Sequence, residues 1–226
     1  MNDISFFPAG DSALVAEFGR EIDESINAQV HAMAAWITAQ RLRGVREVLP
    51  TFRSLMVYYD PLVVSYGRLV RQLSRFSGEK VRETGGEREI VEVPCCYDGP
   101  DLADMQALTG LSAEEIIAIH SGVDYRIYMM GFLPGFVYLG GLDPRIHAPR
   151  LQTPRTRIEP GSVGIGGSQT GIYPVASPGG WRILGRTPLK LYDPTRSQPI
   201  LCRAGQFIRF VPISASEYER LVEKCR

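Results

Sequence analysis

The sequence predicts two domains: an α+β domain, followed by a domain of mainly β-structure. Residues 1–77 alternate between runs with the two-residue period of strands and runs with the spacing of helices. After His120, no helical periodicity is sustained until the last dozen residues, and short β-type runs are bounded by glycine or proline. A polar, charged stretch at 77–89 separates the two parts. We therefore expect domains at 1–85 and 86–226.

The first domain is predicted to hold a ferredoxin-like, split βαβ unit. Leu14, Ala16 and Phe18 share one face of a strand, and Ile26 and Val30 belong to an apolar series at helical spacing. The predicted elements are a strand at 14–18, a helix at 22–37, strands at 45–49 and 53–59, a helix around 69–76 and a closing strand at 90–93. This order is that of a split βαβ unit.

The second domain is predicted to begin with two short helices. Asp101 and Gly110 are the start and stop signals of the first, and Ser112 with Glu115 forms a capping box that opens the second. The strands that follow are expected at 125–130, 161–165, 181–184, 189–192 and 207–211. Many short strands with turns between them indicate a closed or sandwich-like β-architecture.

Composition and charge exclude several classes of protein. The 226 residues are 44% hydrophobic and carry 25 basic against 25 acidic side chains, so a generally basic nucleic-acid binder or a polybasic membrane protein is excluded. No apolar run is long enough to span a membrane, and the N-terminus lacks the features of a signal peptide, so we expect a cytoplasmic protein. The four cysteines are expected to be buried and reduced. No histidine pair has metal-ligand spacing, so no metal is predicted.

Glycine, proline and arginine concentrate in one stretch, residues 131–194. It holds 12 of 23 glycines and 9 of 16 prolines, with seven basic and three acidic side chains. Arginine favours bidentate recognition of carboxylate or phosphate, although any single arginine could equally be a surface residue on a hairpin. The six arginines are Arg145, Arg150, Arg155, Arg157, Arg182 and Arg186.

A glycine-rich loop at 161–174 is a candidate anion site. Glycines allow backbone N–H groups to converge on an anion, which makes Gly166 and Gly167 candidate contacts. The loop lacks the lysine of a P-loop, the third glycine of a dinucleotide fingerprint and the closing glycine of a nucleophile elbow. Tight β-turns are the alternative interpretation. Gln169, Thr170 and Tyr173 add hydrogen-bonding side chains to the same loop.

His120 ends the capped helix, where the helix dipole favours an imidazolium. Two roles are open for it: capping the helix, or acting as a general acid or base.

Three segments of the second domain resemble one known family. They are YRIYMMGFLPGFVYLGGLD at 125–143, PRTRIEPGSVGIGGSQTGIYP at 154–174 and SPGGWRILGRTPLKLYDP at 177–194. Together they are similar to the family of 5-oxoprolinase B subunits and sporulation kinase inhibitors, formerly called allophanate hydrolase subunit 1. The resemblance extends over nearly the whole chain, and it implies a cyclophilin-like β-barrel after a small α+β domain. Members of the family resemble half of the carboxyltransferase region of urea carboxylase.

The resemblance also implies an activity. With partner subunits of two further types, A and C, such a chain forms a 5-oxoprolinase that opens 5-oxo-L-proline to L-glutamate at the expense of ATP. ATP is the cosubstrate of the complex, and the isolated chain is expected to be inactive. Inhibition of the autophosphorylation of a sensor histidine kinase is the alternative. Prolyl isomerisation rests on fold analogy alone.

The sequence and the resemblance together give a site hypothesis. His120 and Arg155 are expected to be catalytic, and the substrate or an anion is expected to contact Gly166, Gly167, Gln169, Thr170 and Tyr173. Five of these residues are predicted to line one pocket that faces the sister subunit of the C type: His120, Arg155, Gln169, Thr170 and Tyr173. No nucleic acid, membrane or metal is expected as a partner.

Overall fold

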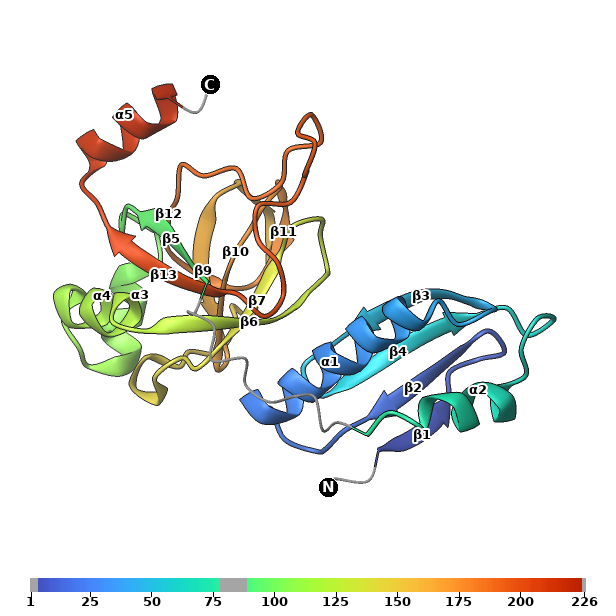
Figure 1. Cartoon of the computed structure of the whole chain (residues 1–226). Coiled ribbons are helices and arrows are strands. Elements are labelled where there is room, and N and C mark those ends of the chain that lie inside the picture. The colour runs from blue at the N-terminus through green and yellow to red at the C-terminus, as the bar shows by residue number, and fades with distance from the viewer. Residues whose placement is uncertain (1–3, 78–88, 225–226) are drawn as a thin grey trace. The chain divides into compact units, whose positions relative to one another are not determined.

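The computed structural model describes residues 4–77 and 89–224 and divides the chain into two units (Figure 1). The first comprises Met1–Glu87 and the second Arg88–Arg226. The predicted boundary between residues 85 and 86 lies outside the described residues.

The first unit is a four-stranded antiparallel sheet with two helices. The strands lie in the order β1-β2-β4-β3, so β2 and β3 run parallel with β4 between them. The elements are β1 (Ser5–Pro8), β2 (Ala13–Glu17), α1 (Glu24–Gln40), β3 (Val45–Pro50), β4 (Ser54–Tyr59) and α2 (Tyr66–Leu73).

The predicted closing strand of this unit is wrong. The residues at 90–93 form a strand, β5 (Ile90–Cys95), but it pairs in the second unit, parallel to β13 (Phe207–Pro212). The edge beside β2 is occupied instead by β1, which forms a hairpin with β2. The apolar pattern identifies a strand but carries no information about which sheet it joins.

Both helices cover one face of this sheet. Leu14 and Ala16 of β2 and Leu55 and Val57 of β4 point to the helices, because side chains two apart in a strand share a face. The buried stripe of α1 consists of Ile26, Val30, Met33 and Ile37. The Asp23 carboxylate accepts the Ser25 and Ile26 N–H groups and caps the helix start.

The second unit is built around a seven-stranded sheet in the order β12-β9-β10-β7-β6-β13-β5. A separate pair joins β11 to β8. Besides β5 and β13, the elements of the second unit are α3 (Leu102–Thr109), α4 (Ala113–Ser121), β6 (Asp124–Met130), β7 (Val137–Gly140), the 3-10 helix η1 (Pro144–Ile146), β8 (Arg155–Ile158), β9 (Ser162–Gly166), β10 (Gln169–Ile172), β11 (Ser177–Gly179), β12 (Arg182–Arg186) and α5 (Ala215–Lys224). The predicted capping box of α4 is confirmed.

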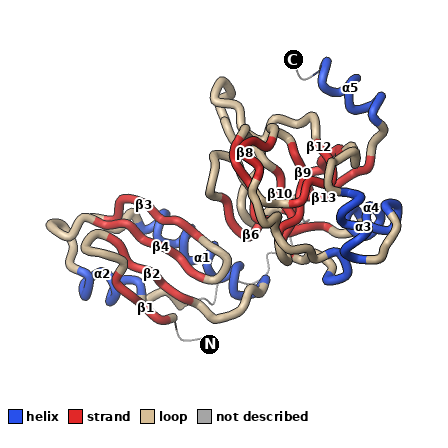
Figure 2. The backbone as a smooth tube through the Cα atoms, turned by 180° about the vertical axis from the view of Figure 1, so that it is seen from behind, coloured by secondary structure: helices blue, strands red, loops and turns tan. Residues whose placement is uncertain are grey.

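The two edges of the seven-stranded sheet meet and close it into a barrel-like ring (Figure 2). Cys96, just after β5, and Arg186, in β12, exchange both backbone hydrogen bonds, at 2.9 and 2.8 Å. The Gly99 N–H adds a third bond to the Leu184 carbonyl at 3.0 Å. We call this junction the seam. The predicted mainly β, closed architecture is therefore confirmed, while the cyclophilin-like type of barrel stays a prediction.

Two glycines permit the close approach of the backbones at the seam. A Cβ atom on Gly99 would overlap the Ile183 carbonyl oxygen, and one on Gly185 would overlap that of Cys96. Both clashes are with backbone atoms, which cannot rotate away as a side chain can.

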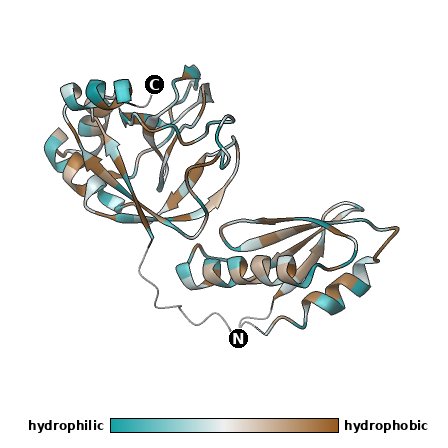
Figure 3. Cartoon of the chain, turned by 45° about the horizontal axis from the view of Figure 1, so that its top comes forward, coloured by the Kyte–Doolittle hydropathy of each residue, from teal (hydrophilic) through white to brown (hydrophobic). Residues whose placement is uncertain are grey.

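Apolar side chains of the barrel strands fill its interior. Figure 3 shows the hydrophobic residues running along the strands of both units. The core centres on Tyr125, Phe210, Val163, Ile165 and Leu139. The thiols of Cys95, Cys96 and Cys202 are buried and free, as predicted; Cys225 lies outside the described residues.

We predict that Gly185→Ala destabilises the second unit by about 1–3 kcal/mol or more, because the added methyl forces the seam apart. Gly131→Ala is the control: its Cβ would meet a single methionine methyl group at ordinary contact distance. Urea unfolding measures both variants. Equal unfolding free energies for the two would contradict the close packing of the seam.

Candidate functional site

His120 lies in the interior of the barrel unit, at the end of α4. Its side chain is fully buried, and its ring stacks near Phe210 with centroids 4.6 Å apart. The Nδ1 atom lies 2.7 Å from the Tyr97 hydroxyl and Nε2 lies 2.8 Å from the Thr170 hydroxyl. The predicted closeness of His120 and Thr170 is thus present in the structure.

One assignment of protons satisfies every hydrogen bond of this group. The Thr170 hydroxyl donates to the Gly164 carbonyl at 3.1 Å, so it must accept the Nε2–H of His120. Nδ1 is then the acceptor for the Tyr97 O–H. The chain of bonds links the end of β5, helix α4 and the β9–β10 hairpin.

This environment keeps His120 neutral. Burial lowers the pKa of its imidazole to about 3. Both ring nitrogens are already engaged, so the geometry supports a structural role for His120 and gives no support to the predicted catalytic one.

The glycine-rich loop is a tight β-hairpin. β9 and β10 pair from Gly166 with Gln169, which leaves Gly167 and Ser168 as the turn, and Gly167 has a φ of +67°. The Gly167 N–H donates to the Ala148 carbonyl at 2.8 Å. A Cβ on Gly166 would overlap the Trp181 ring. The predicted anion cradle is therefore not formed at Gly167, whose amide is paired within the unit.

Gln169 and Tyr173 lie apart from His120 in their contacts. Tyr173 is buried in an aromatic cluster, edge-on to Phe136 at 5.4 Å and Trp181 at 6.2 Å, and burial raises the pKa of its hydroxyl. Gln169 is half-buried at the start of β10. No contact found among the described residues joins Gln169 or Tyr173 to His120, and the single pocket proposed for these residues stays a prediction.

Arg155 is anchored by a buried carboxylate. Its Nη2 lies 2.6 Å from Asp101 Oδ1, and the Asp101 side chain is only 4% exposed. The other oxygen, Oδ2, accepts the Ile183 N–H at 2.6 Å. Asp101 thus joins β8, β12 and the start of α3, and it uses its carboxylate for this purpose instead of capping α3.

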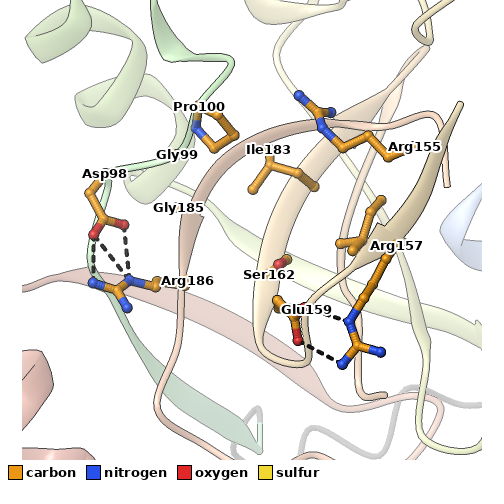
Figure 4. A pocket seen from close by; sticks show the side chains of 11 residues that line it. Asp98, Gly99, Pro100, Arg155, Arg157, Glu159, Ser162, Ile183, Gly185 and Arg186 are labelled. Atoms are coloured by element: carbon orange, nitrogen blue, oxygen red, sulfur yellow. Dashed lines mark hydrogen bonds and ion pairs between the residues drawn. The ribbon is translucent and has the colours of Figure 1, made fainter. Parts of the chain in front are cut away.

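Arg155 also lines a cleft of about 410 Å³ beside the seam (Figure 4). The lining residues are Asp98, Gly99, Pro100, Arg155, Arg157, Ile158, Glu159, Ser162, Ile183, Gly185 and Arg186. We call this space the arginine cleft. Of the predicted site residues, Arg155 alone belongs to it.

The three guanidinium groups of the arginine cleft are held by carboxylates of different burial. Arg157 pairs with Glu159 at 2.6 Å, and both side chains are about two-thirds exposed (66% and 65%). Arg186 grips Asp98 through Nε and Nη2 and lies over the Tyr218 ring of α5 at 4.2 Å. Hydrogen bonding to Arg157 lowers the pKa of Glu159, so both partners are charged.

Sequence reasoning selected the arginines but missed Asp98, Glu159 and Ser162. A signal for Glu159 was present, because Arg157 and Glu159 are two apart on a β-type segment and so share one side. No local pattern could reveal Asp98, which is brought to Arg186 by closure of the barrel.

Comparison with known families accounts for this architecture. Residues 4–202 match the model of the carboxyltransferase domain, subdomain C and D. The chain belongs to this family. The resemblance drawn from the sequence is confirmed.

Individual relatives extend over nearly the full chain. The 5-oxoprolinase B subunit of Bacillus subtilis (strain 168) is 44% identical, covering 95% of both chains. The protein of the same name from Escherichia coli O157:H7 is 39% identical over 90% of this chain and 93% of its own length. A crystal structure of TTHA0988 superposes with a TM-score of 0.81 at 36% identity, covering 90% of this chain and 40% of that one.

Within residues 4–77 and 89–224, no group of three or more His, Cys, Asp and Glu side chains could hold a metal ion. No helix among these residues is long and apolar enough to cross a membrane.

We predict that His120 makes the unfolding free energy fall as the pH drops from 6.5 toward 3. An unfolded histidine titrates near 6.5 and the folded one near 3, so the unfolded chain binds more protons in this window. The slope from this one group is at most about 1.4 kcal/mol per pH unit, and its contribution to stability is fully present above pH 6.5. Urea unfolding of wild type and His120→Gln at several pH values measures it. An equally steep profile in the variant would contradict the assignment.

Proposed function

We propose that the chain is the B subunit of an ATP-dependent 5-oxoprolinase, which opens 5-oxo-L-proline to L-glutamate. The observation that carries the proposal is the 44% identity to a protein of that name over 95% of both chains. Similarity of this extent spans both units, so it is not confined to a widespread barrel fold.

The reaction requires activation of an unreactive amide. A lactam is a poor electrophile, and transfer of a phosphoryl group from ATP to its oxygen releases ADP and makes the carbon electrophilic. Water then adds to that carbon, and the C–N bond breaks so that the ring nitrogen leaves as the amine and an acyl phosphate forms. A second water hydrolyses the acyl phosphate to the glutamate carboxylate and inorganic phosphate. Each of these species is anionic. Guanidinium groups held in a fixed array stabilise developing negative charge because they need little reorganisation. Arg155, fixed by buried Asp101, is such a group.

In this proposal the chain works with the A and C subunits. ATP is the cosubstrate of the assembled complex, and we place the complex in the cytoplasm. A protein named as a subunit implies an assembly. TTHA0988 is consistent with it, because the present chain covers only 40% of that chain, and the counterpart there shares a polypeptide with further residues. The isolated chain is expected to lack activity. Kinase inhibition stays an alternative prediction.

We predict that the chain, co-purified with candidate A and C subunits, releases ADP only when 5-oxoproline is present. The measurement is coupled ADP release with glutamate quantified in parallel. The chain alone and the complex without 5-oxoproline are the controls. An assembled complex that releases neither ADP nor glutamate would refute the enzyme proposal.

Phe132 is a candidate contact with a partner subunit. It is 63% exposed and has a φ of +67°, which bulky residues rarely adopt. The Leu133 N–H donates to the Gly131 carbonyl at 2.8 Å and closes a strained γ-turn around it. The ring packs edge-on against Phe136 at 5.6 Å. The strained backbone holds an apolar ring in solvent, and burial of that ring by a partner would offset the free energy of the strain.

We predict that Phe132→Ala weakens assembly with the partner subunits by about tenfold or more, the cost of removing an aromatic anchor. Its effect on folding should be small, because the ring is mostly exposed. Leu108→Ala, at a 50% exposed position on α3, is the matched control. Surface plasmon resonance with immobilised partner measures both. Unchanged affinity of the Phe132 variant would rule out this contact.

A further inference from the structure

We propose that the arginine cleft binds a small acid that consists of an uncharged ring and one carboxylate. The carboxylate of this ligand pairs with Arg157, and in the unliganded chain Glu159 pairs with Arg157 in its place. The identity of the acid, 5-oxoproline, rests on the proposed function. The site itself rests on four features of the cleft.

The first feature is a hydroxyl that has no hydrogen-bond partner among residues 4–77 and 89–224. Ser162 lines the cleft and is 8% exposed. Its hydroxyl takes part in no hydrogen bond within the described part of the chain. Figure 4 shows it between the Arg186 side and the Arg157 side of the cleft. The hydroxyl is not one of the fully buried polar atoms without a partner, so it is open to the cleft and can form a hydrogen bond with a polar ligand atom such as a lactam oxygen.

The second feature is the contrast between Arg155 and Arg157. Arg155 is fixed by a carboxylate that is 4% exposed, whereas the partner of Arg157 is 65% exposed. An exposed ion pair of this kind contributes about 0–1 kcal/mol, so a ligand carboxylate can replace Glu159 at little cost. Arg157 can therefore exchange its carboxylate partner for a ligand, whereas Arg155 keeps its partner Asp101.

The third feature is the charge of the lining. Three guanidinium groups line the cleft, and each is paired with one carboxylate: Arg155 with Asp101, Arg157 with Glu159 and Arg186 with Asp98. Displacement of Glu159 toward solvent leaves the cleft with positive charge that a single carboxylate neutralises. The planar fork of Arg157 Nε and Nη2, which now holds both Glu159 oxygens, matches a carboxylate in two parallel hydrogen bonds.

The fourth feature is the apolar part of the cleft. Ile158 and Ile183 contribute aliphatic side chains, and Gly99, Pro100 and Gly185 contribute no polar side chain. A small ring without charge fits this surface, which favours a cyclic acid over a strongly hydrated phosphate.

The test is calorimetric titration of the full chain with 5-oxoproline, 2-pyrrolidinone and inorganic phosphate. Pyrrolidinone has the same ring without the carboxylate, and phosphate has the charge without the ring. We expect 5-oxoproline alone to bind. Arg157→Ala should weaken binding by about tenfold to a hundredfold, the worth of a charge-assisted pair. Glu159→Gln should strengthen it by up to about fivefold, because the competing carboxylate is gone.

Arg145→Ala is the matched control. Arg145 pairs with Asp143 two residues away, as Arg157 does with Glu159, but it lies outside the cleft. Its removal should leave affinity unchanged. Circular dichroism shows whether each variant folds, and Arg157→Lys, which keeps the charge but not the fork, should still lose affinity.

Four results would overturn the proposal: no binding of 5-oxoproline by the intact chain, equal binding of pyrrolidinone, phosphate binding as tightly as 5-oxoproline, or wild-type affinity in Arg157→Ala. The site and the function fail separately. An active complex whose KM for 5-oxoproline is unchanged by Arg157→Ala would refute the site and leave the function. Binding by the chain without ATP-dependent ring opening in the complex would refute the function and leave the site.

Discussion

Closure of the seven-stranded sheet on itself is the constraint on which the second unit depends. The reciprocal hydrogen bonds between Cys96 and Arg186 join strands that are about ninety residues apart, and they are possible only because Gly99 and Gly185 lack side chains. An unclosed sheet would expose two unpaired edges and open its core to water. The same closure creates the arginine cleft, because Asp98 on one edge is brought to Arg186 on the other. Stability and site formation therefore share one junction.

The chemistry divides between the interior and this junction. Histidine is a common catalytic residue, but His120 is buried, is neutral and forms hydrogen bonds with Tyr97 and Thr170. It therefore connects α4 to the β9–β10 hairpin. The charged groups that a ligand can reach lie instead at the cleft. Arg157 and Glu159 form its adjustable part, since their ion pair is exposed and weak. A rigid frame with one exchangeable ion pair suits a site that must bind and release a small acid.

Local signals predicted much of the fold and little of the site. The capping box at Ser112 and the stop at Gly110 are confirmed because caps are formed by neighbours in sequence. Residues 189–192 were expected to be a strand from their apolar alternation, but they lie in an irregular segment where Leu191 is buried by tertiary packing. Strands β7, β10 and β11 escaped prediction because glycine or proline obscures their period, and β8 escaped it because four residues with a single apolar side chain show no clear alternation. The glycine loop illustrates the limit for the site: its composition suits both an anion cradle and a hairpin, and the Ala148 carbonyl, distant in sequence, favours the hairpin.

Native-state amide hydrogen exchange tests the central claim, that the seam is an integral part of the barrel. If the account is correct, the amides of Cys96, Gly99 and Arg186 exchange only through the global opening that also exposes Ile165 and Ile172, and their opening free energies match those of these two core strands. Exchange at the seam with the rates of unprotected loop amides, while Ile165 and Ile172 stay protected, would show that the ring is open in solution and would contradict the account.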